Sequence, residues 1–510
     1  MRLNQRKAGV LLNYLYEGIR LLTTLVYTPI MLRLLGESEY GLYDLVSSTV
    51  AYLNLLSLGF SGAYVRYHSQ YYVKDDEDGI ARLNGMFIII FGVMAVLSLV
   101  CGSVMTVKAE LLFDDGLTAT ELAKAKVLMG ILVISTALTF PNTVFTCFVS
   151  AYEQFVFQRL LSVVQSILNP CLVIPLLLLG YDSVAVVLVT AGLTAVTFAV
   201  NAFYCFQKLK MRFSFRNLQP ALLKEMWGFT FFIFLNQIID QANWSVDKFL
   251  LERIKKSTAV VAVYAIGGQI NSLYYQVSSS VVTVFAPRVN RIVASTDDNT
   301  ELTAMMIRVG RIQLLILGLV LSGFALFGQE FIRLWAGDGF GDAYWVALLL
   351  MTPVTVPLIQ NLGIDIQRAK NKHRARSIVC SCLAVGNVLL SIVLIPYFGS
   401  IGAAAGTAVA LLIGNGLFMN WYYHYRIGLN MLTFWKAIIR LLPAGAAAVG
   451  FGVLYTTLIS TTGWIGLVLG IVVYTVGYAL IMWLLGMNRY EKELVLGCLR
   501  AFDRRRSKND

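Results

Sequence analysis

Residues 84–107 read NGMFIIIFGVMAVLSLVCGSVMTV and contain no charged side chain. At about 1.5 Å per residue, a helix of about 20 residues crosses the ~30 Å hydrocarbon core of a bilayer. Similar apolar runs follow one another along the chain, which is 57% hydrophobic and 14% charged. The sequence therefore predicts an all-α, polytopic integral membrane protein with about fourteen transmembrane helices.

The predicted spans are joined by short loops, and little of the chain is left over for a soluble domain. We place them at residues 9–35, 40–64, 84–107, 125–148, 159–179, 184–206, 226–249, 259–284, 304–328, 343–364, 376–397, 401–423, 436–459 and 464–485.

The net charge of +12 is distributed as a membrane topology signal. Alternate loops carry clusters of Lys and Arg, as in 208–216 and 368–376, and so does the segment 504–508. This positive-inside pattern predicts cytoplasmic N- and C-termini, with attraction to membrane lipids as a secondary role, and it argues against nucleic acid as a partner. The seven Cys lack CxxC spacing and only three His are present, so we expect no metal site and no cofactor.

The two halves of the chain resemble each other at an offset of roughly 220 residues, which aligns Tyr43 with Tyr264 and Pro141 with Pro357. Six helices per copy give a parallel repeat, with two lobes around a central cavity. The predicted organisation is an N-lobe at 1–222 (helices 1–6), a C-lobe at 223–430 (helices 7–12), helices 13 and 14 at 431–486, and a basic cytoplasmic tail at 487–510.

Four predicted spans carry polar side chains at steps of three or four residues, which places them on one helical face. Polar groups inside a bilayer are costly unless they face protein or water, so they are candidates for function. We interpret the stripes as the lining of the cavity, with the following candidate substrate-binding residues: Asn13, Glu17 and Arg20 in span 1, Asp44 and Asn54 in span 2, Asn236 and Asn243 in span 7, and Gln269 and Gln276 in span 8.

Two carboxylates are candidates for coupling or gating. Asp240 lies deep in its span with no basic residue within one turn, and burial of that kind favours titration near physiological pH. Asp247 lies near the outer end of the same span, where an interfacial charge is the simpler interpretation. The coupling ion stays open between H⁺ and Na⁺.

Several charged residues have two interpretations. Glu17 and Arg20 are three residues apart, so they either neutralise each other within one helix or serve substrate and gating. Asp44, near the outer mouth, caps a helix or gates the cavity. Arg66 and Arg288 lie at inner helix ends, as snorkelling anchors or as phosphate contacts.

The opening stretch RKAGVLLNYLYEGIRLLTTLVYTPIMLRLLGESEYGLYDLVSS (6–48) resembles the start of bacterial oligosaccharide flippases of the O-antigen and capsule type. These belong to the multidrug/oligosaccharidyl-lipid/polysaccharide exporter superfamily. The resemblance extends to SAYEQFVFQ (150–158), DQANWSVDKFLL (240–251), FIRLWAG (331–337) and IQRAKNKHRARS (366–377).

The resemblance implies a non-enzymatic transporter in the bacterial cytoplasmic (inner) membrane. It would move undecaprenyl-pyrophosphate-linked oligosaccharide from the cytoplasmic to the outer leaflet by alternating access, for cell-surface polysaccharide synthesis. Arg20 would contact the pyrophosphate. The lipid-linked oligosaccharide is the expected partner, and polysaccharide synthesis enzymes are further candidates.

Three other functions stay open. A cation-coupled exporter of drugs or small molecules from the same superfamily would usually have twelve helices. A membrane-bound polysaccharide polymerase or acyltransferase would need a large catalytic loop or a His/Asp constellation, and the sequence offers neither. A scaffold that recruits synthesis enzymes through the basic tail would not need polar stripes.

Overall fold

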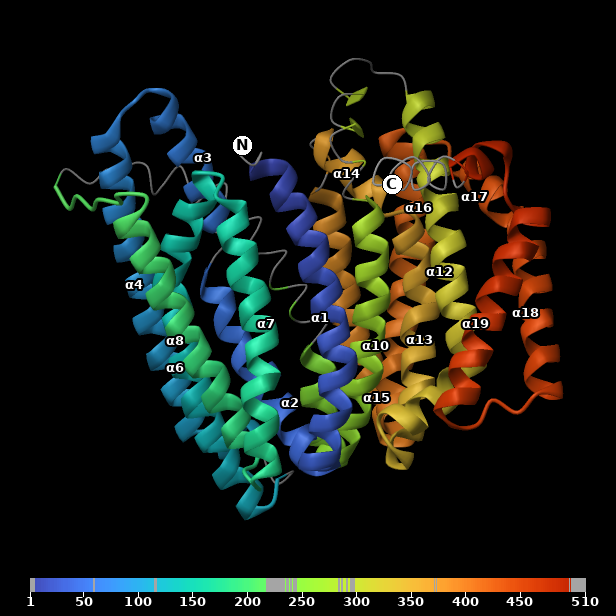
Figure 1. Cartoon of the computed structure of the whole chain (residues 1–510), viewed down its shortest axis with the longest axis horizontal. Coiled ribbons are helices and arrows are strands. Elements are labelled where there is room, and N and C mark those ends of the chain that lie inside the picture. The colour runs from blue at the N-terminus through green and yellow to red at the C-terminus, as the bar shows by residue number, and fades with distance from the viewer. Residues whose placement is uncertain are drawn as a thin grey trace, which may run out of the picture. The chain divides into compact units, whose positions relative to one another are not determined.

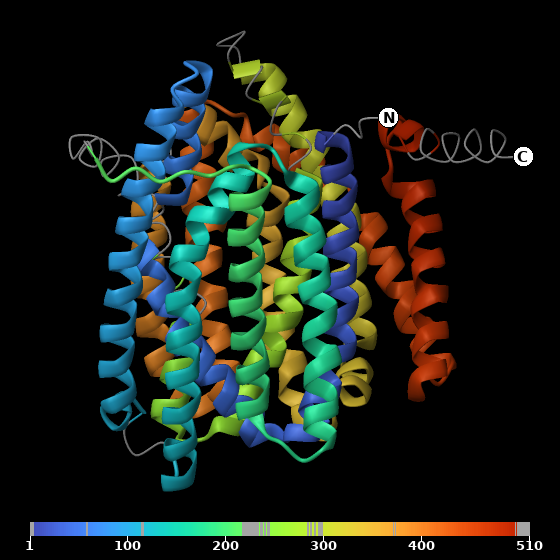
Figure 2. The same cartoon turned by 60° about the vertical axis from the view of Figure 1, so that its left-hand side comes forward.

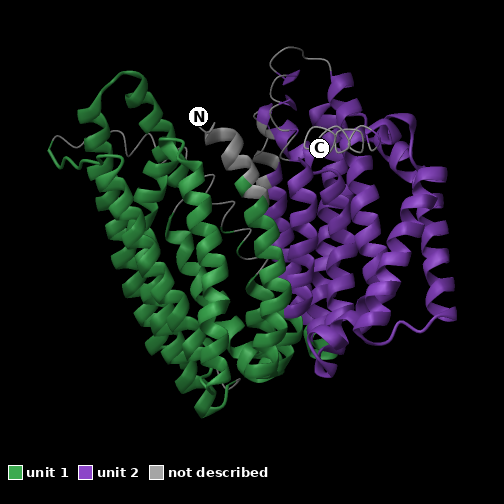
Figure 3. Cartoon of the chain, viewed as in Figure 1, with its two compact units in different colours: residues 1–265, 395–399 green, residues 266–394, 400–510 purple. Residues whose placement is uncertain are grey.

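The structure of the protein is a computed structural model. It describes residues 5–57, 60–113, 117–216, 245–282, 299–370 and 374–494, with 234, 238, 241, 285, 288–289, 292–293, 372 and 496. Every regular element in these residues is a helix, which confirms the predicted all-α fold (Figure 1). The chain divides into two compact units, 1–265 with 395–399, and 266–394 with 400–510 (Figure 3). Residues 245–265 thus cluster with unit 1, whereas the lobe boundary near residue 222 stays a prediction.

Unit 1 contains helices of very different length. They are α1 (Gln5–Leu35), α2 (Glu37–Val50), the 3₁₀ helix η1 (Ala51–Ser57), α3 (Phe60–Val73), α4 (Glu77–Val107), α5 (Ala109–Phe113), α6 (Ala119–Ala151), α7 (Phe155–Leu178), α8 (Ser183–Gln207), the helical residues 245–255 and the start of α10 (Thr258–Val282).

Polar residues fix where the helices of unit 1 begin. Asp76 caps α4 by accepting a hydrogen bond from the Gly79 amide at 2.7 Å. Thr118 and Glu121 form a reciprocal capping box at the start of α6. The carboxylate of Asp182 accepts from the Val184 amide at 3.1 Å and caps α8. Each cap satisfies backbone amides that have no partner within the helix.

The helices of unit 1 pack against partners both near and distant in sequence. α6 contacts α4 on one side and α8 on another, and α7 contacts both α1 and α8 (Figures 1 and 2). An aromatic core lies among α3, α4 and α6, where the rings of Tyr64 and Phe87 meet edge to face at 4.9 Å. This packing holds the long helices in fixed positions and so positions the loops that join them.

Unit 2 contains the rest of α10 and the helices that follow it. They are α12 (Asn299–Trp335), η3 (Asp338–Phe340), α13 (Gly341–Ile359), α14 (Leu362–Ala369), α15 (Arg374–Leu411), the π-helical η4 (Leu412–Phe418), α16 (Met419–Tyr422), η5 (Tyr423–Ile427), α17 (Met431–Ile439), α18 (Leu442–Leu458), α19 (Gly463–Ile481) and η6 (Met482–Gly486).

Hydrogen bonds and an ion pair hold the last helices of unit 2 on α12. Tyr474 and Tyr478 of α19 donate hydrogen bonds to the Ser322 hydroxyl at 2.7 Å and to the Leu315 carbonyl at 3.0 Å. Beyond α19, the guanidinium of Arg311 bonds the buried carboxylate of Glu491 at 2.6 and 3.0 Å. A buried ion pair of this two-pronged geometry fixes the position of the segment that carries Glu491.

Eleven helical stretches among the described residues are long and apolar enough to cross a membrane. Of the predicted spans, 226–249 lies mostly outside these residues, and α10, which carries Gln269 and Gln276, is not among the eleven. The spans 376–397 and 401–423 fall in one stretch, Ile378–Ile427, which is broken at Gly399 where φ is +56°. The predicted count of fourteen stays a prediction.

Large apolar side chains cover the outside of these helices. Phe203 of α8 is 68% exposed, Ile465 of α19 is 80% exposed and Leu484 of η6 is 72% exposed. A water-soluble protein rarely exposes contiguous apolar surface of this kind, whereas lipid tails cover it without cost. The chain is a multi-pass membrane protein.

Candidate functional site

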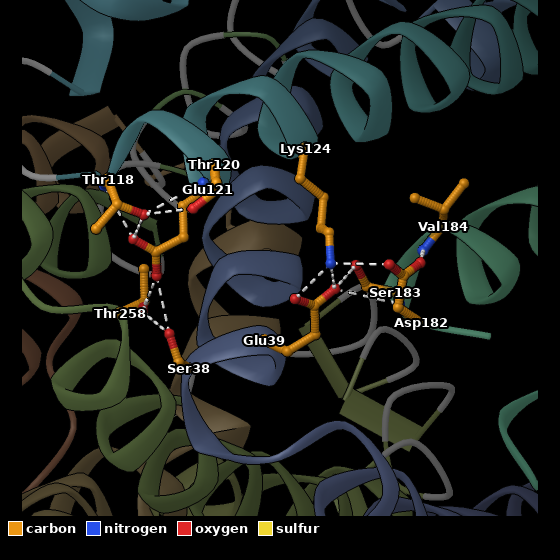
Figure 4. A network of polar contacts seen from close by, with 10 residues as sticks. All are labelled: Ser38, Glu39, Thr118, Thr120, Glu121, Lys124, Asp182, Ser183, Val184 and Thr258. Atoms are coloured by element: carbon orange, nitrogen blue, oxygen red, sulfur yellow. Dashed lines mark hydrogen bonds and ion pairs between the residues drawn. The ribbon is translucent and has the colours of Figure 1, made fainter. Parts of the chain in front are cut away.

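A network of polar side chains joins four helix ends within unit 1. It lies where α2, α6, α8 and α10 all begin, and Figure 4 shows its two halves side by side. The charge distribution of the loops predicts that this end faces the outside of the cell. Because all four helices begin here, their amide dipoles favour the carboxylates that gather at this end.

Lys124 is the centre of the first half. Its ammonium group lies 3.0 Å from the Glu39 carboxylate and 2.8 Å from the Asp182 carboxylate. Glu39 also accepts a hydrogen bond from the Ser183 hydroxyl (Figure 4). One cation therefore joins the first turn of α2 to the capped end of α8.

The charge state of Asp182 supports this arrangement. Burial raises the pKa of its carboxyl, but hydrogen bonds from Lys124 and from the Val184 amide outweigh burial, so the pKa lies below its ordinary value. A carboxyl whose pKa is lowered on folding stabilises the fold above its unfolded pKa and loses that contribution as pH falls through the lowered value. The contact is therefore fully formed at neutral pH.

Glu121 is the centre of the second half. One carboxylate oxygen accepts hydrogen bonds from the hydroxyls of Ser38 at 2.8 Å and Thr258 at 3.1 Å. The other accepts from the amide and hydroxyl of Thr118 at 2.9 and 2.7 Å. The Ser38 and Thr258 hydroxyls are themselves 2.7 Å apart. A single carboxylate thus connects α2, α6 and α10.

The backbone of α2 meets α10 directly beside this contact. A Cβ added to Gly41 would lie 1.9 Å from the Thr258 carbonyl oxygen and 3.3 Å from the Ala262 Cβ. No side chain fits in that space, so α2 and α10 approach this closely because residue 41 is glycine.

A second layer of polar contacts lies further along α2. Lys248 bonds the Asp44 carboxylate at 2.7 Å and the Ser48 hydroxyl at 3.1 Å, and both charged side chains are only about one fifth exposed. The neighbouring Asp247 is buried and accepts a hydrogen bond from the Tyr264 hydroxyl at 2.7 Å. Residues 245–265 are therefore tied to α2 by an ion pair as well as by hydroxyls.

The candidate residues of α1 and α2 have different surroundings. Glu17 and Arg20 lie 3.4 Å apart, so the intrahelical pair that the sequence allowed is formed, with both side chains about two fifths exposed. Asp44 joins Lys248, as described above. Asn54 is exposed on η1, and the side chain of Asn13 lies outside the described part of the chain.

The other candidates fall elsewhere. Gln269 and Gln276 are half-buried on α10. Arg66 is exposed on α3, with its guanidinium 6.0 Å from the Tyr67 ring, and Arg288 is 3.9 Å from Glu301. Asn236, Asp240 and Asn243 lie outside the described residues, and so no position is given for them.

Most members of the network were not among the candidates. Glu39, Glu121, Lys124 and Asp182 all lie at the ends of predicted spans, where a charge ordinarily contacts water. The Thr118–Glu121 spacing of a capping box was a readable signal for a helix start. Nothing in the sequence indicates that the Glu121 carboxylate also reaches Thr258.

Comparison with known proteins gives a family and a fold. The family model described as "Polysaccharide biosynthesis protein" matches residues 7–293, more than half of the chain. No curated protein matches the chain in sequence.

Three solved structures have a similar fold at low sequence identity. The lipid II flippase MurJ, in an inward closed conformation, is 15% identical with a TM-score of 0.73 and covers 95% of this chain and 100% of its own. An inward-facing multidrug resistance MATE family transporter of the MOP superfamily is 16% identical with a TM-score of 0.60, covering 82% and 98%. An outward-facing one is 17% identical with a TM-score of 0.55, covering 85% and 98%.

The contact at Gly41 gives a first prediction. Replacing Gly41 by Val forces α2 and the start of α10 apart, because the new side chain collides with the Thr258 carbonyl. In a chain whose native cysteines are replaced, we expect a Ser48→Cys reporter to react several-fold faster with a membrane-impermeant thiol reagent added from outside.

Gly62→Val is the matched control, because nothing lies within 4 Å of a Cβ added there. Equal labelling of the Gly41→Val and Gly62→Val chains would show that the close approach of α2 and α10 does not keep the reagent away from residue 48.

Proposed function

Because the chain belongs to the polysaccharide biosynthesis protein family, we propose that it is a flippase for a lipid-linked glycan. It translocates undecaprenyl-pyrophosphate-linked oligosaccharide from the cytoplasmic to the outer leaflet of the bacterial cytoplasmic membrane. The oligosaccharide then serves cell-surface polysaccharide synthesis. The fold shared with a lipid II flippase supports this function.

The need for a transporter follows from the chemistry of the cargo. A sugar headgroup that enters hydrocarbon loses its hydrogen bonds to water, at a cost of several kcal/mol for each unpaired group. Polar side chains along the route replace those bonds while the prenyl chain stays in lipid. Alternating access keeps the route closed at one end while it is open at the other.

The observation that carries the proposal is a set of polar contacts at the predicted outer end of unit 1, which we call the seal. Residues 245–265 are held there by four contacts: Thr258 with Ser38 and Glu121, and Lys248 with Asp44 and Ser48. A neutral hydrogen bond contributes about 0.5–1.5 kcal/mol net and one to a charged group about 1.5–3 kcal/mol, because water replaces either when it breaks. Each of these contacts can therefore be exchanged for contacts with water, which suits a gate that opens and closes.

The residues that meet the cargo are proposed from the sequence stripes. Arg20, paired with Glu17 and half-exposed, is proposed to exchange that partner for the pyrophosphate. Asn13, Asn54, Asn236 and Asn243, with Gln269 and Gln276, are proposed to bond the sugars, and Arg66 and Arg288 are proposed phosphate contacts at the inner ends.

Coupling is proposed at Asp240 and Asp247. Asp247 is buried and bonded to the Tyr264 hydroxyl, so its ionisation changes a contact between residues 245–255 and the start of α10. Binding of H⁺ or Na⁺ there would change this contact within residues 245–265, the segment that the seal holds.

A second candidate function is export of a small molecule in exchange for a cation. The similarity to multidrug resistance transporters in fold favours it. It predicts the same gate but a different cargo, so the cargo has to be identified directly.

The ion pair between Asp44 and Lys248 gives a prediction for transport. Asp44→Lys places two cations together in a site that is mostly buried, so export should fall at least about tenfold. The swapped pair, Asp44→Lys with Lys248→Asp, should recover most of it, as measured by surface glycan per unit of membrane-inserted protein.

The matched control reverses an exposed ion pair instead. Glu110→Lys opposes Lys126, from which Glu110 lies 2.7 Å away, and Glu110 is 66% exposed, so we expect little effect. Failure of the swapped pair to recover export would assign Asp44 to the cargo rather than to the gate.

The proposed cargo is tested by depleting the protein in its own host. We expect intact lipid-linked oligosaccharide to accumulate in the cytoplasmic leaflet, as detected by leaflet-resolved labelling. Normal surface glycan without accumulation would exclude this cargo and leave small-molecule export as the function.

A further inference from the structure

A pocket of about 180 Å³ opens in unit 2 where α12 begins. Its walls come from the first turns of α12, from residues 285 and 288 just before it, and from Tyr490 beyond η6. The loop charges predict that this end faces the cytoplasm. The pocket therefore lies at the end of α12 that is predicted to be cytoplasmic.

Two arginines line this pocket. The Arg308 guanidinium lies 5.2 Å from the centre of the Tyr490 ring, and Arg288 lies 3.9 Å from the Glu301 carboxylate. Arg288 and Glu301 are more than half exposed, so their long contact is weak. Two cations facing one carboxylate leave the pocket with a net positive charge.

The residue after Tyr490 is anchored to α12. Tyr490 precedes Glu491, whose carboxylate is clamped by Arg311 and also accepts a hydrogen bond from the Asn488 amide at 2.9 Å. Arg311 is one turn beyond Arg308 on α12, and Glu491 matches its charge. The clamp thus places the Tyr490 ring beside Arg308 without adding net charge to the pocket.

The remaining lining is apolar. Phe285, Met305, Val309 and Ile312 face the same space as the two arginines. An apolar wall beside two guanidinium groups suits an amphipathic anion better than a free inorganic ion, because both parts of such a ligand are matched.

We propose that this pocket binds the phosphate ester of a membrane lipid at the cytoplasmic surface. Arg288 and Arg308 bond the phosphate oxygens, Arg288 exchanging Glu301 for the lipid, and the apolar wall contacts the first methylenes of the chain. The site is lined by unit 2 alone. With an anionic phospholipid as ligand the proposal is independent of the cargo, whereas with a polyprenyl phosphate it rests on the proposed function, in which Arg288 contacts the cargo phosphate. The phosphate belongs either to an anionic phospholipid or to a polyprenyl phosphate.

Binding to the purified full chain in detergent, followed by native mass spectrometry, tests the proposal. The probes are phosphatidylglycerol, undecaprenyl phosphate and zwitterionic phosphatidylcholine. Arg288→Gln with Arg308→Gln should weaken binding of the anionic lipid at least about tenfold, since charge-assisted bonds are lost. Whichever anionic probe loses more affinity identifies the source of the phosphate.

Two further variants control for general surface charge and for misfolding. Arg489→Gln removes one nearby positive charge from a side chain that is 94% exposed and paired with Glu493, so it should leave binding unchanged. Glu301→Gln removes the carboxylate that competes with the phosphate for Arg288, so it should tighten binding. Tighter binding cannot come from an unfolded protein.

Parental affinity in the Arg288/Arg308 double variant would overturn the proposal. Equal loss in Arg489→Gln would do the same, because it would reduce the effect to general surface charge. Binding of phosphatidylcholine as tight as that of both anionic probes would also contradict it.

Discussion

The closed end of unit 1 depends on the carboxylate of Glu121. Its two oxygens accept four hydrogen bonds from residues of three helix ends, and two of these donors, Ser38 and Thr258, also contact each other. Ser38 and Thr118 are exposed, so this carboxylate gathers its donors at the solvent-facing end of the helices and not in the core. The close approach at Gly41 lets Thr258 reach it. We expect the removal of either feature to loosen the contact between α10 and α2.

The two ends of the described helices differ in how their charges are matched. At the predicted outer end, Lys124 is shared by Glu39 and Asp182, and Asp44 is bonded to Lys248, so the carboxylates there have cationic or hydroxyl partners. In the pocket of unit 2, two arginines face one distant carboxylate. Matched charges suit a seal that must exclude ligands, and unmatched cations suit a site that attracts an anion.

The helices themselves could be predicted from the sequence, because uncharged runs such as 84–107 have only one stable form in a bilayer. The break at Gly399 lies between the predicted spans 376–397 and 401–423. Asp44 was recognised because a carboxylate inside an apolar span is costly. Glu39, Glu121 and Lys124 were missed, because a charge at a span end ordinarily contacts water and only tertiary packing gives it a protein partner.

The most direct test of the gate is a reversible cross-link between Ser38→Cys and Thr258→Cys, whose parental hydroxyl oxygens are 2.7 Å apart. Surface glycan would be measured in cells before and after oxidation, and again after reduction, with each single cysteine variant as control. If the junction opens during transport, export stops when the disulfide forms and resumes when it is reduced. Export at the parental rate with the disulfide intact would show that this junction is a fixed structural contact and not the gate.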